Sequence, residues 1–218
     1  MKIVETVFDC CFVMEPFLRE DNRCVMEVLY RRREQDGALF DFDLKEQRIY
    51  RIPKKHTFFG IHDQSVDNPQ GKLIGVIQGR GLDYIVDLRS ESSTFRQYKC
   101  LELDGNHPRL VYIAPGFGHG FLTLEDNTIQ TFAMDAEFRD ERSGAISYKD
   151  TEIGLSLPVE DVILSDYDAD TCNFDNRMVL FEFRLSALVS TTQYVVKCPR
   201  NWTPKGVYWH QKEGARNV

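Results

Sequence analysis

Short segments in which apolar and polar residues alternate recur along most of the 218 residues of this chain. Alternation with a period of two residues is typical of β-strands that bury one face. Turn-forming residues separate the segments, for example at 67–71, 104–108 and 125–127. The segments that predict strands are residues 25–30, 47–52, 72–78, 82–88, 109–113, 121–124, 130–134 and 178–183. This rhythm predicts an all-β sandwich or barrel.

Helical periodicity is weak throughout the sequence. The best candidates are a short helix over residues 159–164 and a turn over residues 166–171. Strands and helices do not alternate, so a doubly wound α/β fold is not expected. We predict one β domain over residues 1–190, with short C-terminal helical elements. Residues 191–218 are less regular, and we expect this extension to pack on the barrel through aromatic side chains such as Trp202 and Trp209.

The charge balance excludes one large class of function. The chain has 27 Lys and Arg against 34 Asp and Glu, which gives a formal net charge of −7. A general nucleic-acid-binding protein needs a dominant basic face, so we expect no nucleic-acid partner. No apolar run approaches the roughly 20 residues of a membrane span, and the first residues lack a secretory apolar region. We expect a cytoplasmic protein without a membrane partner.

The six cysteines give no sign of a metal site. They form no Cys-x-x-Cys pair and have no histidine companions at zinc-binding spacing. We interpret most of them as reduced, buried small side chains and predict no metal. A catalytic thiol is the minor alternative.

Two segments carry residues suited to proton abstraction. His62 lies in Phe59-Gly60-Ile61-His62-Asp63-Gln64, and Lys72 begins the next predicted strand. On neighbouring strands of a barrel these two side chains can converge in one interior. A base with a pKa of about 6.5 can remove a hydrogen next to a ketone only if the enolate oxygen is stabilised electrostatically. His62 and Lys72 therefore suggest enolate chemistry, whereas Asp63, as the next strand residue, should point away from His62.

An ordered series of motifs connects the chain to a known family. The motifs are Gly60-Ile61-His62, Gln70-Gly71-Lys72-Leu73-Ile74, residues 79–89, Pro115-Gly116-Phe117-Gly118-His119-Gly120-Phe121 and Leu164-Ser165-Asp166-Tyr167-Asp168. From about Asp21 to Asp168 the chain resembles dTDP-4-dehydrorhamnose 3,5-epimerase and related cupin-fold nucleotide-sugar epimerases. Single motifs are weak evidence, but the ordered series is specific.

The resemblance implies a cupin jelly-roll barrel and a homodimer that exchanges N-terminal strands, without a metal or other cofactor. The implied substrate is a nucleotide-diphosphate-linked 4-keto-6-deoxy sugar, which is epimerised or isomerised in deoxysugar and polysaccharide biosynthesis. The family's base matches His62, held by Asp168, and its lysine near the ketone oxygen matches Lys72. A carboxylate behind the histidine fixes the imidazole tautomer and favours the imidazolium as it forms.

Several positions depart from the family pattern around the expected substrate site. Phe59 stands where the family has an arginine, and the family's Gln-x-Asn-x-Ser stretch reads Gln47-Arg48-Ile49-Tyr50-Arg51. We hypothesise that Arg51 restores the charge lost at Phe59, because both would border one opening. Arg23 is retained from the segment that binds the nucleotide across the dimer, and it could meet a diphosphate. The predicted substrate-binding residues are Arg23, Gln47, Arg51, Phe59, His119 and Phe132.

The most consequential departure concerns the proton donor. The family's tyrosine, which reprotonates the enolate from the face opposite the base, aligns with Phe132, and the next tyrosine position aligns with Phe138. A phenylalanine cannot deliver a proton. Three outcomes remain open: epimerisation at a single carbon with another acid, a one-face isomerisation or dehydration, or binding without catalysis. Retention of His62, Lys72 and Asp168 favours catalysis, and the loss of the tyrosine favours reaction at a single carbon, C3 or C5.

Each candidate residue also has a structural alternative. His62 could be a structural histidine, Lys72 a solvated hairpin residue, and Asp168 a helix or turn cap. For His119, substrate contact and a structural role have equal weight. The main functional alternative is a noncatalytic sugar-nucleotide-binding protein on the same barrel. A metal-dependent cupin oxygenase is more distant, because His62 and His119 alone fall short of a set of two histidines and one carboxylate.

Overall fold

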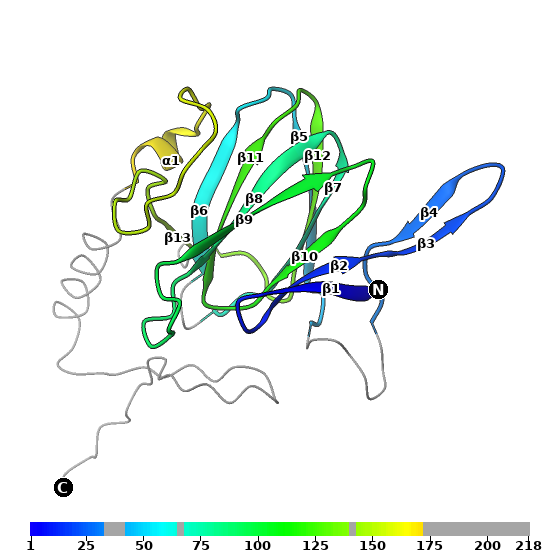
Figure 1. Ribbon diagram of the computed structural model, residues 1–218, viewed down its shortest axis with the longest axis horizontal. Helices are drawn as coiled ribbons and strands as arrows, with labels where there is room; N and C mark the ends of the chain where they lie inside the picture. Colours follow the sequence, from blue (N-terminus) through cyan, green and yellow to red (C-terminus); the bar gives the residue numbers. More distant parts are fainter. Residues whose placement is uncertain (33–41, 65–67, 140–142, 172–218) are drawn as a thin grey trace, which may run out of the picture.

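The first of two facing β-sheets contains six strands. The computed structural model describes residues 1–32, 42–64, 68–139 and 143–171 (Figure 1). In spatial order the strands of this sheet are β1 (Lys2–Val7), β2 (Cys11–Glu15), β10 (Leu110–Ile113), β7 (Lys72–Gln78), β12 (Thr128–Met134) and β5 (Glu46–Ile52). Every neighbouring pair in it is antiparallel.

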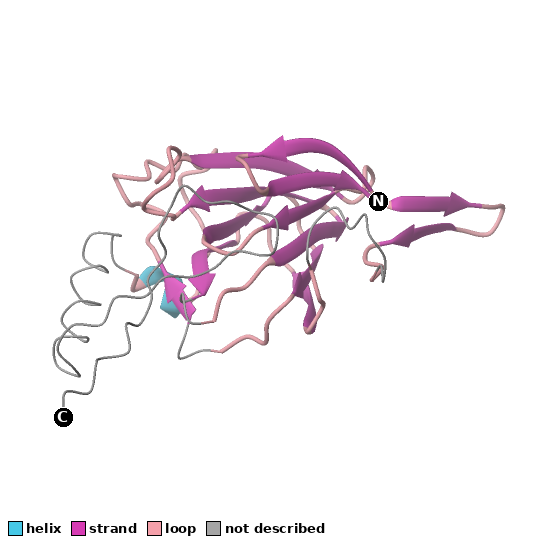
Figure 2. Ribbon diagram, turned by 90° about the horizontal axis from the view of Figure 1, so that it is seen from below, coloured by secondary structure: helices cyan, strands magenta, loops and turns pink. Residues whose placement is uncertain are grey.

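The second sheet lies across from the first and is also antiparallel (Figures 1 and 2). Its five strands are, in spatial order, β13 (Ser143–Ala145), β6 (Phe58–Gln64), β11 (Phe117–Thr123), β8 (Arg80–Asp87) and β9 (Tyr98–Asp104). A separate hairpin of β3 (Phe17–Glu20) and β4 (Val25–Val28) projects from the body, and a single short helix, α1 (Asp166–Ala169), follows the strands in the described part of the chain (Figure 1). The predicted all-β jelly-roll class is confirmed.

The alternating pattern located most of the central strands. Each strand predicted between residues 25 and 134 overlaps a strand of the structure, whereas the prediction at 178–183 lies outside the described residues. The pattern missed β1, β2, β3, β9 and β13, and β6 was expected as a strand only from the argument on His62. In β2 the reason is visible, because the consecutive apolar residues Phe12, Val13 and Met14 hide the alternation.

The main hydrophobic core fills the space between the two sheets. Ile74 and Val111 from the first sheet, and Ile85 and Phe121 from the second, are completely buried there. Burial of a side chain of this kind contributes roughly 1.5–3 kcal/mol, so this layer is what holds the sheets together.

A further cluster covers the outer face of the second sheet. It is built on Phe58, Tyr84 and Leu122, and residues 155–164 pack against it. The helix predicted over 159–164 is therefore wrong. This segment is extended, because the backbone of Ile163 bonds to the start of β6, accepting from Phe58 N at 2.9 Å and donating to His56 O at 2.8 Å. The turn predicted at 166–171 contains α1, which this segment delivers to the rim of the barrel.

Other predictions have mixed outcomes. The domain boundary at residue 190 and the extension 191–218 lie outside the described residues. The expectation of mostly buried cysteines is wrong for the described part of the chain, where Cys11 is buried, Cys10 is half-buried, and Cys24 and Cys100 are exposed. Within the same residues, no helix combines the length and the apolar character needed to cross a membrane.

Candidate active site

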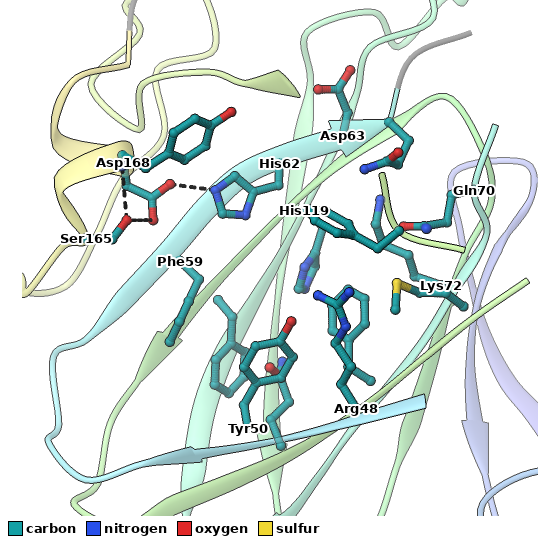
Figure 3. A pocket seen from close by; sticks show the side chains of 17 residues that line it. Arg48, Tyr50, Phe59, His62, Asp63, Gln70, Lys72, His119, Ser165 and Asp168 are labelled. Carbon is teal, nitrogen blue, oxygen red and sulfur yellow. Dashed lines mark hydrogen bonds and ion pairs between the residues drawn. The ribbon is translucent and has the colours of Figure 1, made fainter. Parts of the chain in front are cut away.

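A cavity of about 540 Å³ opens between the two sheets (Figure 3). Small-molecule sites typically have roughly 300–1,000 Å³ and combine apolar walls with a few polar groups. The apolar wall consists of Phe59, Phe121, Phe132, Met134 and Phe138. The polar lining consists of Arg48, Tyr50, His62, Asp63, Gln64, Gln70, Lys72, His119, Gln130, Ser165, Tyr167 and Asp168. The predicted residues Phe59, His62, Lys72, His119, Phe132 and Asp168 therefore meet in one place.

His62 reaches this cavity because β6 contains a bulge. Phe59 pairs with Phe121 of β11 and His62 pairs with His119, so two residues of β6 oppose one residue of β11. The extra residue shifts the alternation of side chains. Phe59 and His62 consequently both line the cavity, while Ile61 is buried in a separate cluster.

The bulge requires a glycine at position 60. Gly60 has φ +107°, a conformation that other residues rarely adopt. A Cβ atom on this residue would lie 2.5 Å from the carbonyl oxygen of His119. The Gly-Ile-His motif is thus the local sequence that turns His62 inward.

A carboxylate holds the His62 ring from behind. Asp168 Oδ1 lies 2.5 Å from His62 Nε2 (Figure 3), and the Asp168 side chain is 2% exposed against 38% for His62. Ser165, the N-cap of α1, fixes this carboxylate, because its hydroxyl donates to Asp168 Oδ2 at 3.0 Å and accepts from Asp168 N at 3.1 Å. The capping role considered for Asp168 therefore belongs to Ser165.

The contact with Asp168 also defines the chemistry of the His62 ring. An ionised carboxylate only accepts hydrogen bonds, so Nε2 carries the hydrogen and Nδ1 keeps the lone pair. Figure 3 shows this second nitrogen turned toward the cavity. The lone pair of His62 therefore faces the cavity.

Lys72 comes from the other sheet and lies across the cavity from His62 (Figure 3). Its side chain is buried, and desolvation lowers the pKa of the ammonium group, although the charges of Asp63 and Asp135 oppose this shift. No hydrogen bond joins its Nζ to another of the described residues. A buried ammonium group without such a partner is costly, and an anionic or carbonyl oxygen in the cavity would relieve that cost.

His119 has its own carboxylate partner. Its Nε2 lies 2.7 Å from Asp83 Oδ1, and both residues are buried. The ring also lines the cavity and packs beside Phe132, with ring centroids 5.6 Å apart. The two alternatives for His119, a structural partner and a cavity contact, are both present.

Strand β5 turns other residues to the cavity than the sequence analysis expects. Arg48 and Tyr50 line it, whereas Gln47 and Arg51 are exposed on the opposite face of the strand. Successive strand residues point to opposite sides. Gln47 and Arg51 therefore cannot face the cavity when Arg48 and Tyr50 do. The hypothesis that Arg51 borders the same opening as Phe59 is therefore wrong.

Arg48 brings a cation to this wall, and it is already paired. Its Nη2 lies 2.6 Å from Glu46 Oε1, and its guanidinium stacks 4.5 Å above the ring of Phe138. Desolvation acts to lower the pKa of Arg48, but the nearby Tyr50 hydroxyl and the Glu46 carboxylate outweigh it and raise that pKa. Arg48 and Tyr50 therefore line the same wall of the cavity.

The placement of Asp63 and Arg23 also bears on the sequence-based expectations. Asp63 also borders the cavity, but Figure 3 shows its carboxylate directed away from the His62 ring, so Asp168 is the partner of His62. Arg23 lies in the loop of the projecting hairpin, where its Nη2 is 2.6 Å from Asp21 Oδ2 and its side chain is 79% exposed. Arg23 does not line the cavity of its own chain.

Comparison with known proteins assigns this geometry to a family. A family model described as dTDP-4-dehydrorhamnose 3,5-epimerase matches residues 5–176. The chain belongs to this family. It is 30% identical over 171 residues to a dTDP-4-dehydrorhamnose 3,5-epimerase of Methanothermobacter thermautotrophicus, covering 77% of this chain and 91% of the relative. It is 28% identical to a dTDP-4-dehydro-6-deoxyglucose 3-epimerase of a Streptomyces species, covering 71% and 79% of the two chains.

A solved structure supports the same assignment. The crystal structure of dTDP-4-dehydrorhamnose 3,5-epimerase from Bacillus anthracis, with TDP and PPi bound, superposes with a TM-score of 0.74 at 31% identity. The match covers 79% of this chain and 99% of that chain. This member of the epimerase family is thus a carbohydrate epimerase for nucleotide sugars, with a part in deoxysugar biosynthesis.

Sequence reasoning missed several side chains that line the epimerase cavity. They are Arg48, Tyr50, Gln70, Gln130, Ser165 and Tyr167. For β5 the apolar pattern is ambiguous, because Ile52 shares its face with Arg48 and Tyr50 while the equally apolar Ile49 lies on the exposed face. For α1 no periodic signal exists, since the helix has a single turn.

Proposed function

We propose that this epimerase removes a proton next to the ketone of a nucleoside-diphosphate-linked 4-keto-6-deoxy sugar, at one carbon, C3 or C5. The observation that carries the proposal is the contact between His62 and Asp168 at a cavity whose opposite wall holds the ammonium group of Lys72. A base held by a carboxylate and a cation across a sugar-sized space are what enolate formation requires.

In the proposed step, the lone pair of His62 Nδ1 takes the proton from the carbon next to the ketone. The electrons of the C–H bond form the carbon–carbon double bond of the enolate, and the ketone oxygen becomes negative. Lys72 pairs with this oxygen, and the negative charge of the oxygen offsets the desolvation of the buried ammonium group. Asp168 stabilises the imidazolium, because its Oδ1 already accepts the hydrogen of Nε2.

The substrate class follows from the family and from the cavity wall. The relatives are named for dTDP-linked dehydro sugars, and one solved relative holds TDP. Phe59, Phe132 and Tyr50 offer flat apolar surfaces to a deoxysugar ring, while His119 offers a ring nitrogen for a hydroxyl group. We propose that Phe59, Phe132 and His119 contact the sugar.

Reaction at a single carbon is supported by the absence of a proton donor at positions 132 and 138. Phe132 and Phe138 line the cavity and carry no proton that a carbanion could take. Inversion at both C3 and C5 would need a donor for each carbon. The similarity to a 3-epimerase is consistent with the restriction to one carbon.

We further propose a homodimer in which the β3–β4 hairpin of one chain packs on its partner. The hairpin exposes Phe17, Leu18, Val25 and Met26, each by 41–55% of its surface, and pairs with no other described strand. An isolated two-stranded hairpin is at best marginally stable in water, so we expect these apolar side chains to be buried in an interface. A partner hairpin would also bring Arg23 of one chain to the cavity of the other chain.

We also propose a cytoplasmic location. The free thiols among the described residues suit the reducing cytoplasm.

The test is deuterium uptake by dTDP-4-dehydro-6-deoxyglucose in D₂O, followed by NMR. The proposal expects deuterium at C3 or at C5, but not at both, together with the inverted product. An absence of exchange at either carbon would contradict proton abstraction and favour a binding protein. Exchange at both carbons would contradict the restriction to one.

Two matched variants separate catalysis from binding. His62→Asn should abolish exchange and turnover while dTDP-sugar binding, measured by calorimetry, changes by only a few-fold, because the ring mainly serves as base. His107→Asn changes the same side-chain type at a site that is 83% exposed and outside the cavity, and it should behave as wild type.

A further inference from the structure

Inversion at a carbon requires a second proton-bearing group, on the side of the sugar ring that faces away from His62. This inference rests on the proposed function and identifies that group. His119 is the cross-strand neighbour of His62 in the same sheet, and the Tyr167 ring lies 6.0 Å from the His62 ring. Both therefore belong to the side of the base, and the donor must come from the opposite wall.

The opposite wall offers few groups that can give up a proton. Among the described residues, its polar side chains at the cavity are Arg48, Tyr50, Lys72 and Gln130, from β5, β7 and β12, together with Gln70 just before β7. Arginine does not lose its proton in proteins, and a glutamine amide is not an acid. Lys72 is assigned to the ketone oxygen, where it must stay charged. Tyr50 is what remains.

Tyr50 is held in a position that suits a donor. Its ring packs against Phe59 and Phe132, with centroids 5.9 Å apart in both cases, so it forms part of the surface on which the sugar would lie. Figure 3 shows its hydroxyl group directed from the first sheet into the cavity, on the far side from Asp168. On β12, the facing residue of Tyr50 is Gln130, and Phe132 lies one place further along the same face.

Arg48 supplies the charge that a tyrosine acid needs. Proton transfer from Tyr50 leaves a phenolate, and a cation within hydrogen-bond reach stabilises it. Arg48 and Tyr50 both line the cavity, Tyr50 is among the groups that raise the pKa of Arg48, and contacts with Glu46 and Phe138 fix the direction of the guanidinium. Arg48 therefore acts as a positioning residue behind Tyr50.

We propose that Tyr50 is the catalytic acid of this epimerase and protonates the enolate on the face opposite His62. The electrons on the enolate oxygen re-form the carbonyl bond, the carbon–carbon π pair takes the proton of the Tyr50 hydroxyl, and the O–H bond pair stays on the phenolate. The cycle closes when His62 releases its proton to water and Tyr50 takes one from water. No co-reactant is required.

The decisive variant is Tyr50→Phe, which keeps the ring and removes only the hydroxyl. In D₂O with dTDP-4-dehydro-6-deoxyglucose, formation of the inverted product should fall by about 10²–10⁴-fold, the range for loss of a general acid. Deuterium should still enter recovered substrate with retention within a few-fold of the wild-type rate, because His62 can return a solvent deuteron to its own face. Equal losses of both rates, or no loss of product formation, would overturn the role of Tyr50.

The wild-type protein and control variants distinguish a failure of the Tyr50 role from a failure of the proposed function. If the wild-type protein neither exchanges nor converts the substrate, the proposed function fails, whereas a failure of Tyr50 alone leaves wild-type exchange intact. Tyr167→Phe removes a hydroxyl on the side of the base and should leave the ratio of product to exchange unchanged. Tyr50→Phe/Phe132→Tyr moves the hydroxyl to the adjacent ring, and recovery of product formation by at least about tenfold over Tyr50→Phe is expected.

Discussion

Lys72 and Arg89 are buried cations of equal exposure, 4% each, but the protein surrounds them in opposite ways. Arg89 donates to both oxygens of the buried Asp87, through Nε at 2.8 Å and Nη2 at 2.7 Å, and Nη2 is also 2.9 Å from Asp9. Its guanidinium lies 4.4 Å above the ring of Phe117. Lys72 has carboxylates nearby but no hydrogen bond to another of the described residues.

The pKa values of the two cations move in opposite directions as a result. Desolvation acts against the charge of Arg89, but hydrogen bonds to Asp87 and Asp9 outweigh it and raise the pKa. At Lys72 desolvation prevails and lowers the pKa. A cation whose hydrogen bonds the fold already satisfies serves the fold, and one that the fold leaves unsatisfied beside a cavity is available to a ligand.

The largest expected effect comes from Arg89→Met. It leaves Asp87 charged, completely buried and without its main partner, which typically costs about 3–5 kcal/mol of stability. Urea unfolding should show this loss, and catalysis should suffer only as far as the protein unfolds. The double variant Asp87→Asn/Arg89→Met should be more stable than Arg89→Met, because it leaves no unpaired buried charge. A single variant as stable as wild type would contradict the structural role of the pair.

Lys72→Met should show the opposite balance of effects. Loss of the cation at the enolate oxygen is expected to lower kcat by about 10²–10³-fold, as for other groups that stabilise a developing oxyanion. Thermal stability should stay equal or rise, since the variant removes a buried charge whose largest electrostatic contribution is desolvation. Steady-state kinetics and thermal melting on the same preparation provide the comparison. A strongly destabilised variant would mean that Lys72 belongs to the fold, like Arg89.

The pH dependence of turnover sharpens the same distinction. Lys72 must carry its proton to stabilise the enolate, so activity is present below the pKa of Lys72 and is lost as the pH rises through it. Because burial lowers this pKa in the free enzyme, the alkaline limb of kcat/KM should lie below the ordinary lysine value of about 10.4. Lys72→Arg, whose charge does not titrate in this range, should move the limb upward even if its activity is lower. An unchanged limb in that variant would assign it to another group.

The sequence was sufficient for the proposed catalytic groups His62, Lys72 and Asp168, and insufficient for the strand geometry that orients the other cavity residues. The types and order of His62, Lys72 and Asp168, with the family resemblance, led to the three side chains that meet at the cavity. The strand alternation in β5 and β12 also marked the correct segments. These are properties of residue type and periodicity, which a sequence contains directly.

The remaining features depend on register. A single bulge in β6 decides that Phe59 and His62 face the same side, and no residue type announces it except Gly60, which has several other possible roles. On β5 an error of one residue exchanged Arg48 and Tyr50 for Gln47 and Arg51. Because a shift of one residue reverses every side chain of a strand, such errors affect whole sets of site residues at once.

The smallest expected effect concerns Arg51, a cation that is neither buried nor at the cavity. Arg51→Ala removes a side chain from the exposed face of β5, so stability should change by no more than about 0.5 kcal/mol, with kcat and KM unchanged. Arg48→Ala is the matched variant on the other face of the same strand, and it should lower kcat because Tyr50 loses its neighbouring cation. Kinetics of the two variants side by side test the register of β5 directly. If Arg51→Ala weakened substrate binding while Arg48→Ala did not, the strand would face the other way, and the role assigned to Tyr50 would fall with it.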